Sequence, residues 1–169
     1  GPGGYWNVEK AMEHFKEPLA GQNFKRGKAM YQATTCNRCH SVQGEGGNIG
    51  PDLTRAGTRF GTKDLLEAII EPSKTISDQY AATQLQLKNG ESVVGRIVNE
   101  DETSYTVSQN PYAPDYTISV KKKDVASKTY SKVSSMMPGL MNSLNAEEMK
   151  DLVAYIMAGG DEGLSFIHI

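Results

Sequence analysis

The sequence predicts a mainly α-helical fold that carries a small antiparallel β insertion. Apolar residues recur at helical spacing in three segments, at about 22–33, 63–71 and 145–158. Between the second and third of these segments, from about 78 to 133, apolar and polar residues alternate as they do in strands. We therefore expect a main domain over residues 21–160 that is interrupted by the β-rich insertion at 78–133.

The composition limits the class of protein. The 169 residues suffice to bury the core of one domain with an insertion. The net charge of −2 gives no reason to expect nucleic acid or an anionic membrane surface as a partner, and no apolar run approaches the roughly 20 residues that span a bilayer. Residues 1–20 are expected to be an extension and residues 161–169 a tail. The Gly-Pro-Gly-Gly start is interpreted as a cloning remnant that replaces a secretion signal or an upstream domain.

A short helix is compatible with residues 6–17, because Pro18 would end it. Its apolar residues are Trp6, Met12 and Phe15. We expect this helix to be an extra element laid on the domain, with His14 solvated and not a metal ligand.

The next helix, at about 22–33, has a glycine in its interior. Phe24, Gly27, Lys28 and Tyr31 share one face at helical spacing. Glycine inside a helix costs about 1 kcal/mol relative to alanine, so we expect the close approach of another helix to compensate at Gly27. Chance occurrence of the glycine is the alternative.

The segment Cys36-Asn37-Arg38-Cys39-His40 contains both cysteines of the chain and has the spacing of a covalent c-type haem site. Two intervening residues let one helical turn present both sulfurs to one edge of the porphyrin, where each adds to a vinyl group. His40 then lies under the iron, which a neutral imidazole nitrogen can bind. A redox-active cysteine pair and half of a zinc site are the alternatives. The first normally follows a strand, and the second usually needs four ligands, whereas the other histidines, His14 and His168, lie near the two ends.

The residues after the motif are expected to surround the ring. Residues 43–48 form a glycine-rich loop, which we interpret as backbone that wraps a flat ring. Pro51 has no N–H, and a carbonyl beside it can accept a hydrogen bond from the far nitrogen of His40 and fix the orientation of that ring. Arg55 and Arg59 follow closely. One of them is expected to bind a haem propionate, with a surface arginine in water as the alternative.

A helix over about 63–71 is expected to be capped by Thr62 and ended by Pro72, with Asp64 in its first turn.

After this helix, apolar and polar residues alternate along the chain as they do in strands. The expected strands lie at 83–87, 93–98, 105–107 and 116–120. Asn89-Gly90 predicts a tight hairpin, and Gly95 is interpreted as a bulge. The insertion is expected to resemble an SH3-like or Sm-like barrel. Lys121-Lys122-Lys123 is interpreted as a solvated strand end, with a docking patch as the alternative.

The last helix is expected to begin after Asn145, with acidic residues in its first turn, and to end at Gly159-Gly160. Its apolar stripe consists of Met149, Leu152, Val153 and Ile156, flanked by Tyr155.

The second iron ligand decides the function. Met136 and Met137 lie in a non-helical stretch before Pro138, and the residue before a proline is held extended, which can aim its side chain from an ordered loop. We favour Met137 over Met136, with Met141 third. Met30, Met149 and Met157 lie within predicted helices and are expected to fill the core.

These residues resemble a class I cytochrome c. The resemblance rests on Gly27 with Tyr31, Cys36 to His40, Gly50 to Leu53, Met137-Pro138 and a final helix with Tyr155. The run from Gly50 through Pro72, then a β segment and Met-Met-Pro-Gly-Leu, is similar to the haem-binding cytochrome domains of planctomycetes and verrucomicrobia. The resemblance covers about 22–158. It implies that Met137 is the sixth ligand and that the first and last helices cross at Gly27. The chain departs from a compact cytochrome in the insertion, since about 97 residues separate His40 from Met137.

Three functions are compatible with these features. The first is a non-enzymatic electron carrier with one haem c, bound through Cys36 and Cys39, that exchanges single electrons with a redox partner protein. The second is a haem-based ligand sensor or small-molecule haem enzyme in which Met137 is displaced. The third is a haem module of a larger dehydrogenase, with the insertion as its docking element. Haem attachment in bacteria predicts a periplasmic location, or another outside the cytoplasmic membrane.

Overall fold

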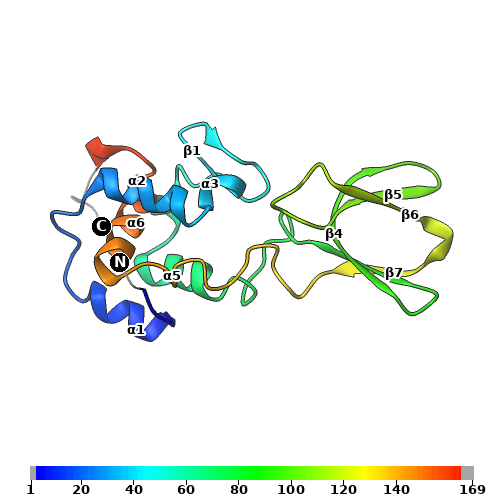
Figure 1. Ribbon diagram of the computed structural model, residues 1–169, viewed down its shortest axis with the longest axis horizontal. Helices are drawn as coiled ribbons and strands as arrows, with labels where there is room; N and C mark the ends of the chain where they lie inside the picture. The colour runs from blue at the N-terminus through cyan, green and yellow to red at the C-terminus, as the bar shows by residue number, and fades with distance from the viewer. Residues whose placement is uncertain (1–2, 165–169) are drawn as a thin grey trace. The chain divides into compact units, whose positions relative to one another are not determined.

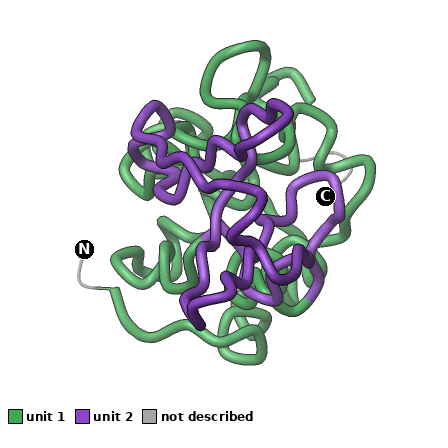
Figure 2. The backbone as a smooth tube through the Cα atoms, turned by 90° about the vertical axis from the view of Figure 1, so that its right-hand side faces the viewer, with its two compact units in different colours: residues 1–74, 137–169 green, residues 75–136 purple. Residues whose placement is uncertain are grey.

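The computed structural model describes residues 3–164, and within them the chain forms two compact units (Figures 1 and 2). The helical unit comprises the chain up to Lys74 and from Met137 onward, and the sheet unit comprises Thr75–Met136. The predicted insertion, 78–133, falls within the sheet unit. His168, most of the expected tail and the first two residues of the expected remnant lie outside the described residues.

The helical unit is built from short elements. They are α1 (Val8–Met12), η1 (Glu13–Phe15), α2 (Phe24–Ala33), α3 (Cys36–Cys39), β1 (Ser41–Val42), β2 (Glu45–Gly46), α4 (Ala56–Arg59), α5 (Thr62–Ile70), α6 (Ala146–Met157) and η3 (Glu162–Leu164). Helix makes up 33% of the described residues and strand 21%, so the prediction of a mainly α-helical fold is not clearly supported. No helix of the described part is long and apolar enough to cross a membrane.

Helices α2 and α6 pack directly against each other, and Gly27 is the reason that they can. A Cβ at Gly27 would lie 2.8 Å from Cβ of Tyr155 and would overlap the carbonyl oxygen of Asp151. The close approach of another helix, predicted from the glycine, is therefore confirmed. Asp151, buried on α6, also accepts a hydrogen bond from the backbone N–H of Asn23 and pairs with Arg26.

The ends of α6 follow the predicted pattern. The side chain of Asn145 accepts from the backbone N–H of Glu148, whose carboxylate accepts in return from the N–H of Asn145. Gly159 and Gly160 end the helix with φ values of +60° and +72°, which other residues rarely adopt. The predicted apolar stripe of α6 is buried throughout.

Two predictions in this unit need correction, and one helix was not predicted. Thr62 is the first residue of α5, not its cap, because the chain is extended at Gly61 and the helix starts there without a side-chain cap. The first helix is shorter than 6–17, since α1 gives way to a 3₁₀ turn. The sequence did not predict α4, whose four residues are too few to show a period.

The sheet unit is a five-stranded antiparallel sheet with the order β6-β5-β4-β3-β7. Its strands are β3 (Thr83–Leu87), β4 (Ser92–Glu100), β5 (Ser104–Ser108), β6 (Thr117–Lys121) and β7 (Val125–Tyr130), with the 3₁₀ turn η2 (Lys122–Asp124) before the last. Leu85, Val107 and Val120 form its core. The likeness to an SH3-like or Sm-like barrel stays a prediction.

The bulge predicted at Gly95 lies elsewhere. Gly95 pairs in register with Thr83, and the irregularity falls between Ile97 and Asn99. Glycine is needed at position 95 because a Cβ there would lie 2.7 Å from Cγ1 of Val107 and would overlap the carbonyl oxygen of Ser108. A close approach between neighbouring strands therefore explains this glycine.

Candidate functional site

The two cysteines are the first and last residues of the single turn α3. The turn is closed by the N–H of His40, which donates to the carbonyl oxygen of Cys36 at 2.9 Å. Before it, Thr35 has a φ of +64°, an uncommon conformation for a β-branched residue, and this reverses the chain between α2 and α3. Burial raises the pKa of both thiols, so both stay protonated at neutral pH. A protonated thiol is the form that adds, S–H across C=C, to a vinyl group.

His40 is fixed by a hydrogen bond on one side of its ring. Nδ1 lies 2.7 Å from the carbonyl oxygen of Pro51 and donates to it. The sequence predicted such a bond to a carbonyl beside Pro51, and the acceptor is the carbonyl of Pro51 itself. Burial lowers the pKa of His40, and the carbonyl of Pro51 only partly opposes this. The ring is therefore neutral at neutral pH with an unprotonated Nε2, which is the state of an imidazole that can bind a metal.

Three glycines bring the following loop directly against the motif. Gly47 donates to the carbonyl of Asn37 at 2.9 Å, and Gly50 donates to that of Cys39 at 2.8 Å. A Cβ at Gly46 or Gly47 would overlap backbone of the motif, and one at Gly50 would lie 2.5 Å from Cε1 of His40. The loop predicted to wrap a flat ring thus packs on the turn that carries the cysteines, and Gly44 serves the tight turn between β1 and β2. The glycines were visible in the sequence, but what they contact was not.

Tyr31 connects the helix pair to the motif, a role that sequence reasoning missed. Its hydroxyl donates to the carbonyl oxygen of His40 at 2.9 Å, and its ring lies 5.3 Å from that of Tyr155 on α6. Burial raises the pKa of Tyr31, so the hydroxyl keeps its proton and remains a donor. The packing of α2 on α6 is thereby coupled to the position of His40.

The remaining predicted site residues are two arginines that follow Pro51 and the methionines that follow the sheet unit. Arg55 directly precedes α4 and Arg59 ends it, and both side chains are exposed. Met137 is the first residue of the helical unit after the sheet unit, and the residue is 44% exposed. Met136 is half-buried and belongs to the sheet unit, whereas Met141 is buried in the helical unit.

Comparison with known families decides between the haem, redox and zinc interpretations of the motif. Residues 24–108, half of the chain, match the family model of cytochrome c. The chain belongs to the cytochrome c family. The matched stretch contains Cys36, Cys39, His40 and Pro51 and ends before Met137. No curated protein matches the sequence significantly.

The residues of this cytochrome fit a covalently bound haem c. Two protonated thiols stand three positions apart on one turn, and a neutral imidazole follows with its far nitrogen engaged. Within residues 3–164, no group of three or more His, Cys, Asp or Glu is placed to hold a metal ion without a porphyrin. When bound, the haem supplies an iron that alternates between the ferric and ferrous states. Cytochrome c domains are generally electron carriers and not enzymes.

Proposed function

We propose that this cytochrome carries single electrons between redox partners, with one haem held by Cys36 and Cys39 and its iron bound by His40 and Met137. The observation that carries the proposal is the state of His40. Its ring is neutral, its Nδ1 is engaged by Pro51, and its backbone is held by Tyr31. A ligand fixed in this way needs little rearrangement when the charge of the iron changes.

The assignment of Met137 rests on its exposure and its position. Two other methionines of the helical unit, Met141 and Met149, are 2% and 0% exposed and fill the core. Met137 is 44% exposed and precedes Pro138, which holds its backbone extended. Its thioether is therefore available to bind the iron. A thioether favours ferrous iron and raises the midpoint potential of the haem.

Three substitutions test the ligand assignment in the haem-loaded protein. Met137→His should keep a low-spin iron and lower the midpoint potential, because imidazole favours ferric iron more than a thioether does. Met137→Ala should give a high-spin or water-bound iron that takes up carbon monoxide when reduced. Met136→Ala is the matched control and should do neither. The opposite result for the two alanine variants would transfer the role to Met136.

A second candidate role concerns the sheet unit, which has its own core of Leu85, Val107 and Val120. A separately packed unit can serve as a docking element for a dehydrogenase without affecting the haem. Replacing residues 78–133 by a short linker should then abolish reduction by that partner and leave the haem spectrum unchanged. Equal rates of reduction with and without the unit would exclude this role.

We further propose that the protein works outside the cytoplasmic membrane, in the periplasm where the organism has one. The support is the covalent attachment of haem, which takes place there in bacteria. The likeness to the planctomycete and verrucomicrobial type is also a proposal, supported by the run from Gly50 through Pro72 and by Met-Met-Pro-Gly-Leu after the β segment. Fractionation of the native organism, with haem staining of each fraction, tests the location.

A further inference from the structure

We infer that the N-terminal segment, residues 3–15, clamps the loop that follows Met137, and that Trp6 is the positioning residue of this clamp. The inference rests on the proposed role of Met137 as an iron ligand. It gives a function in this cytochrome to an extension that the sequence suggested was only laid on the domain.

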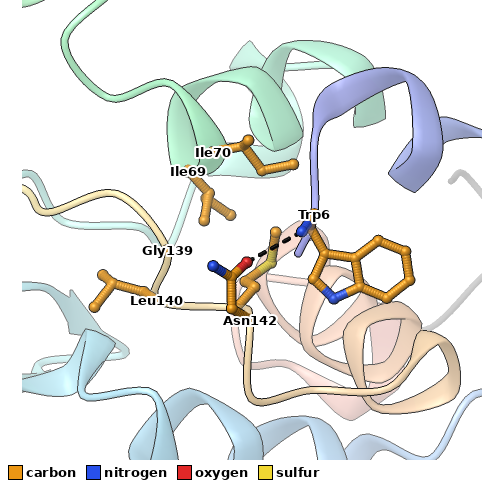
Figure 3. Close-up of a pocket in the computed structure, with 7 residues that line it drawn as sticks. Trp6, Ile69, Ile70, Gly139, Leu140 and Asn142 are labelled. Atoms are coloured by element: carbon orange, nitrogen blue, oxygen red, sulfur yellow. Dashed lines mark hydrogen bonds between the residues drawn. The ribbon is translucent and has the colours of Figure 1, made fainter. Parts of the chain in front are cut away.

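Trp6 holds the loop by two hydrogen bonds. Its indole N–H donates to the carbonyl oxygen of Leu144 at 3.0 Å. Its backbone N–H donates to Oδ1 of Asn142 at 3.2 Å (Figure 3). Trp6 is only 7% exposed, and the first bond is buried and shielded from water. Next to it, Gly3 lies so close to the loop that a Cβ would be 2.5 Å from the carbonyl carbon of Ser143.

The loop has hydrogen bonds of its own and also lies against α5. The N–H of Asn142 donates to Gly139 at 3.0 Å, and the N–H of Leu144 donates to Met141 at 2.9 Å. Ile69 and Ile70 of α5 line a small pocket with Trp6 and with the loop (Figure 3). Helix α5, Trp6 and the loop therefore meet around this one pocket.

The indole of Trp6 also contacts two side chains of its own segment. The ring of His14 stands edge-on to the indole at 5.5 Å, and the ammonium group of Lys10 lies 5.1 Å from the ring centre. His14 is exposed, as expected for a solvated side chain, and its ring contacts Trp6. The indole is thus held by its own segment, and a held indole can restrain the loop.

A restrained loop keeps its ligand bound more tightly. The Met137 thioether competes for the iron with any external ligand, and its effective concentration depends on how few conformations the loop can adopt. Without the indole N–H, the carbonyl of Leu144 loses its partner and the loop gains freedom. The segment before α2 therefore determines how readily the sixth position opens.

The test is a titration of the ferric holoprotein with imidazole. The loss of the thioether-to-iron charge-transfer band measures how much imidazole has replaced Met137. Trp6→Phe keeps an aromatic ring but removes the N–H donor, and it should raise the affinity for imidazole about tenfold, equivalent to about 1.4 kcal/mol. Asn142→Ala removes the other acceptor and should shift the affinity in the same direction. Asn142→Asp keeps an acceptor oxygen and should restore the wild-type affinity.

Asn23→Ala is the matched control, because it removes the cap of α2 and destabilises the same unit without touching the loop. Unchanged affinity in Trp6→Phe and Asn142→Ala, or an equal rise in Asn23→Ala, would overturn the inference. If Trp6→Phe does not fold, the two Asn142 variants decide. A wild-type protein without the charge-transfer band would instead refute the proposed ligation by Met137.

Discussion

Gly50 lies so close to the imidazole of His40 that a Cβ at position 50 would be 2.5 Å from Cε1 and 2.8 Å from Nδ1. The same residue donates to the carbonyl of Cys39, and the next residue, Pro51, accepts from Nδ1. One short stretch of backbone thus sets both the plane of the ring and its rotation. Because Gly50 has no side chain, the imidazole ring of His40 can lie directly against the backbone at this position.

Gly50→Ala should therefore displace the His40 ring and weaken its bond to Pro51. We expect a partly high-spin iron and a loss of about 1–3 kcal/mol in the free energy of unfolding, the usual cost of overpacking. Absorbance spectra and denaturant unfolding of the holoprotein measure both. Gly61→Ala is the control, because its Cβ would meet nothing closer than 3.8 Å. An unchanged spin state in Gly50→Ala would contradict the role of Gly50.

Gly27→Ala should destabilise the helical unit although alanine is the better helix former. The gain in helix propensity is about 1 kcal/mol, whereas overlap with the backbone of Asp151 cannot be relieved by a rotamer change. We expect a net loss of about 2 kcal/mol, measured by denaturant unfolding. Lys28→Ala, at the exposed neighbouring position, should change stability by no more than about 0.5 kcal/mol. Equal stabilities of the two variants would argue against the close helix crossing.

Arg55→Gln and Arg59→Gln test the predicted propionate partner. Removing a positive charge beside the haem favours ferric iron, so the midpoint potential should fall in the variant whose arginine binds a propionate. The change corresponds to about 1 kcal/mol or less, because both arginines are exposed. The pH dependence of the midpoint potential should change as well, since the propionate that has lost its arginine protonates more readily. Potentials that equal the wild-type value across pH in both variants would remove the claim.

Asp101 should contribute to the stability of the sheet unit in a pH-dependent way. Its carboxylate accepts from the backbone N–H groups of Thr103 and Ser104, both at 2.8 Å, and these bonds lower its pKa below the ordinary 3.8. The contribution is therefore present above pH 3.8 and is lost as the pH falls through the lower folded-state value. NMR titration of the carboxyl carbon measures that pKa directly. In urea, Asp101→Asn should be less stable than wild type at neutral pH, and the difference should shrink in acid; a constant difference would contradict this account.

Features coded by near neighbours were predicted well from the sequence. The spacing of the cysteines, the cap at Asn145 and the apolar stripe of α6 depend on residues at most a few turns apart. The bond from His40 to Pro51 was also predictable, because a proline that donates nothing directs attention to the carbonyls around it. Gly27 could be interpreted correctly because an interior glycine has a known cost and few compensations.

Features that depend on distant partners were missed or misread. Gly95 resembled a bulge because its real reason, the backbone of Ser108, becomes visible only when β4 and β5 pair. In strand β7, apolar and polar residues alternate too weakly for the sequence to show where the preceding turn ends and the strand begins. Trp6 looked like part of an accessory helix, since its partners follow it by 136 and 138 residues.

The long separation in sequence between the two parts of the helical unit also affects how the protein folds during synthesis. Asn23 and Asp151, which join α2 to α6, are 128 residues apart, and the whole sheet unit is synthesised between them. Helix α2 is therefore synthesised long before α6 exists to pack against it. Until α6 has folded onto α2, Tyr31 lacks the ring of Tyr155, and the inserted sheet lengthens the stretch that must be made first. Shortening the insertion would thus test how fast the two parts of the helical unit associate, as well as the docking of a partner.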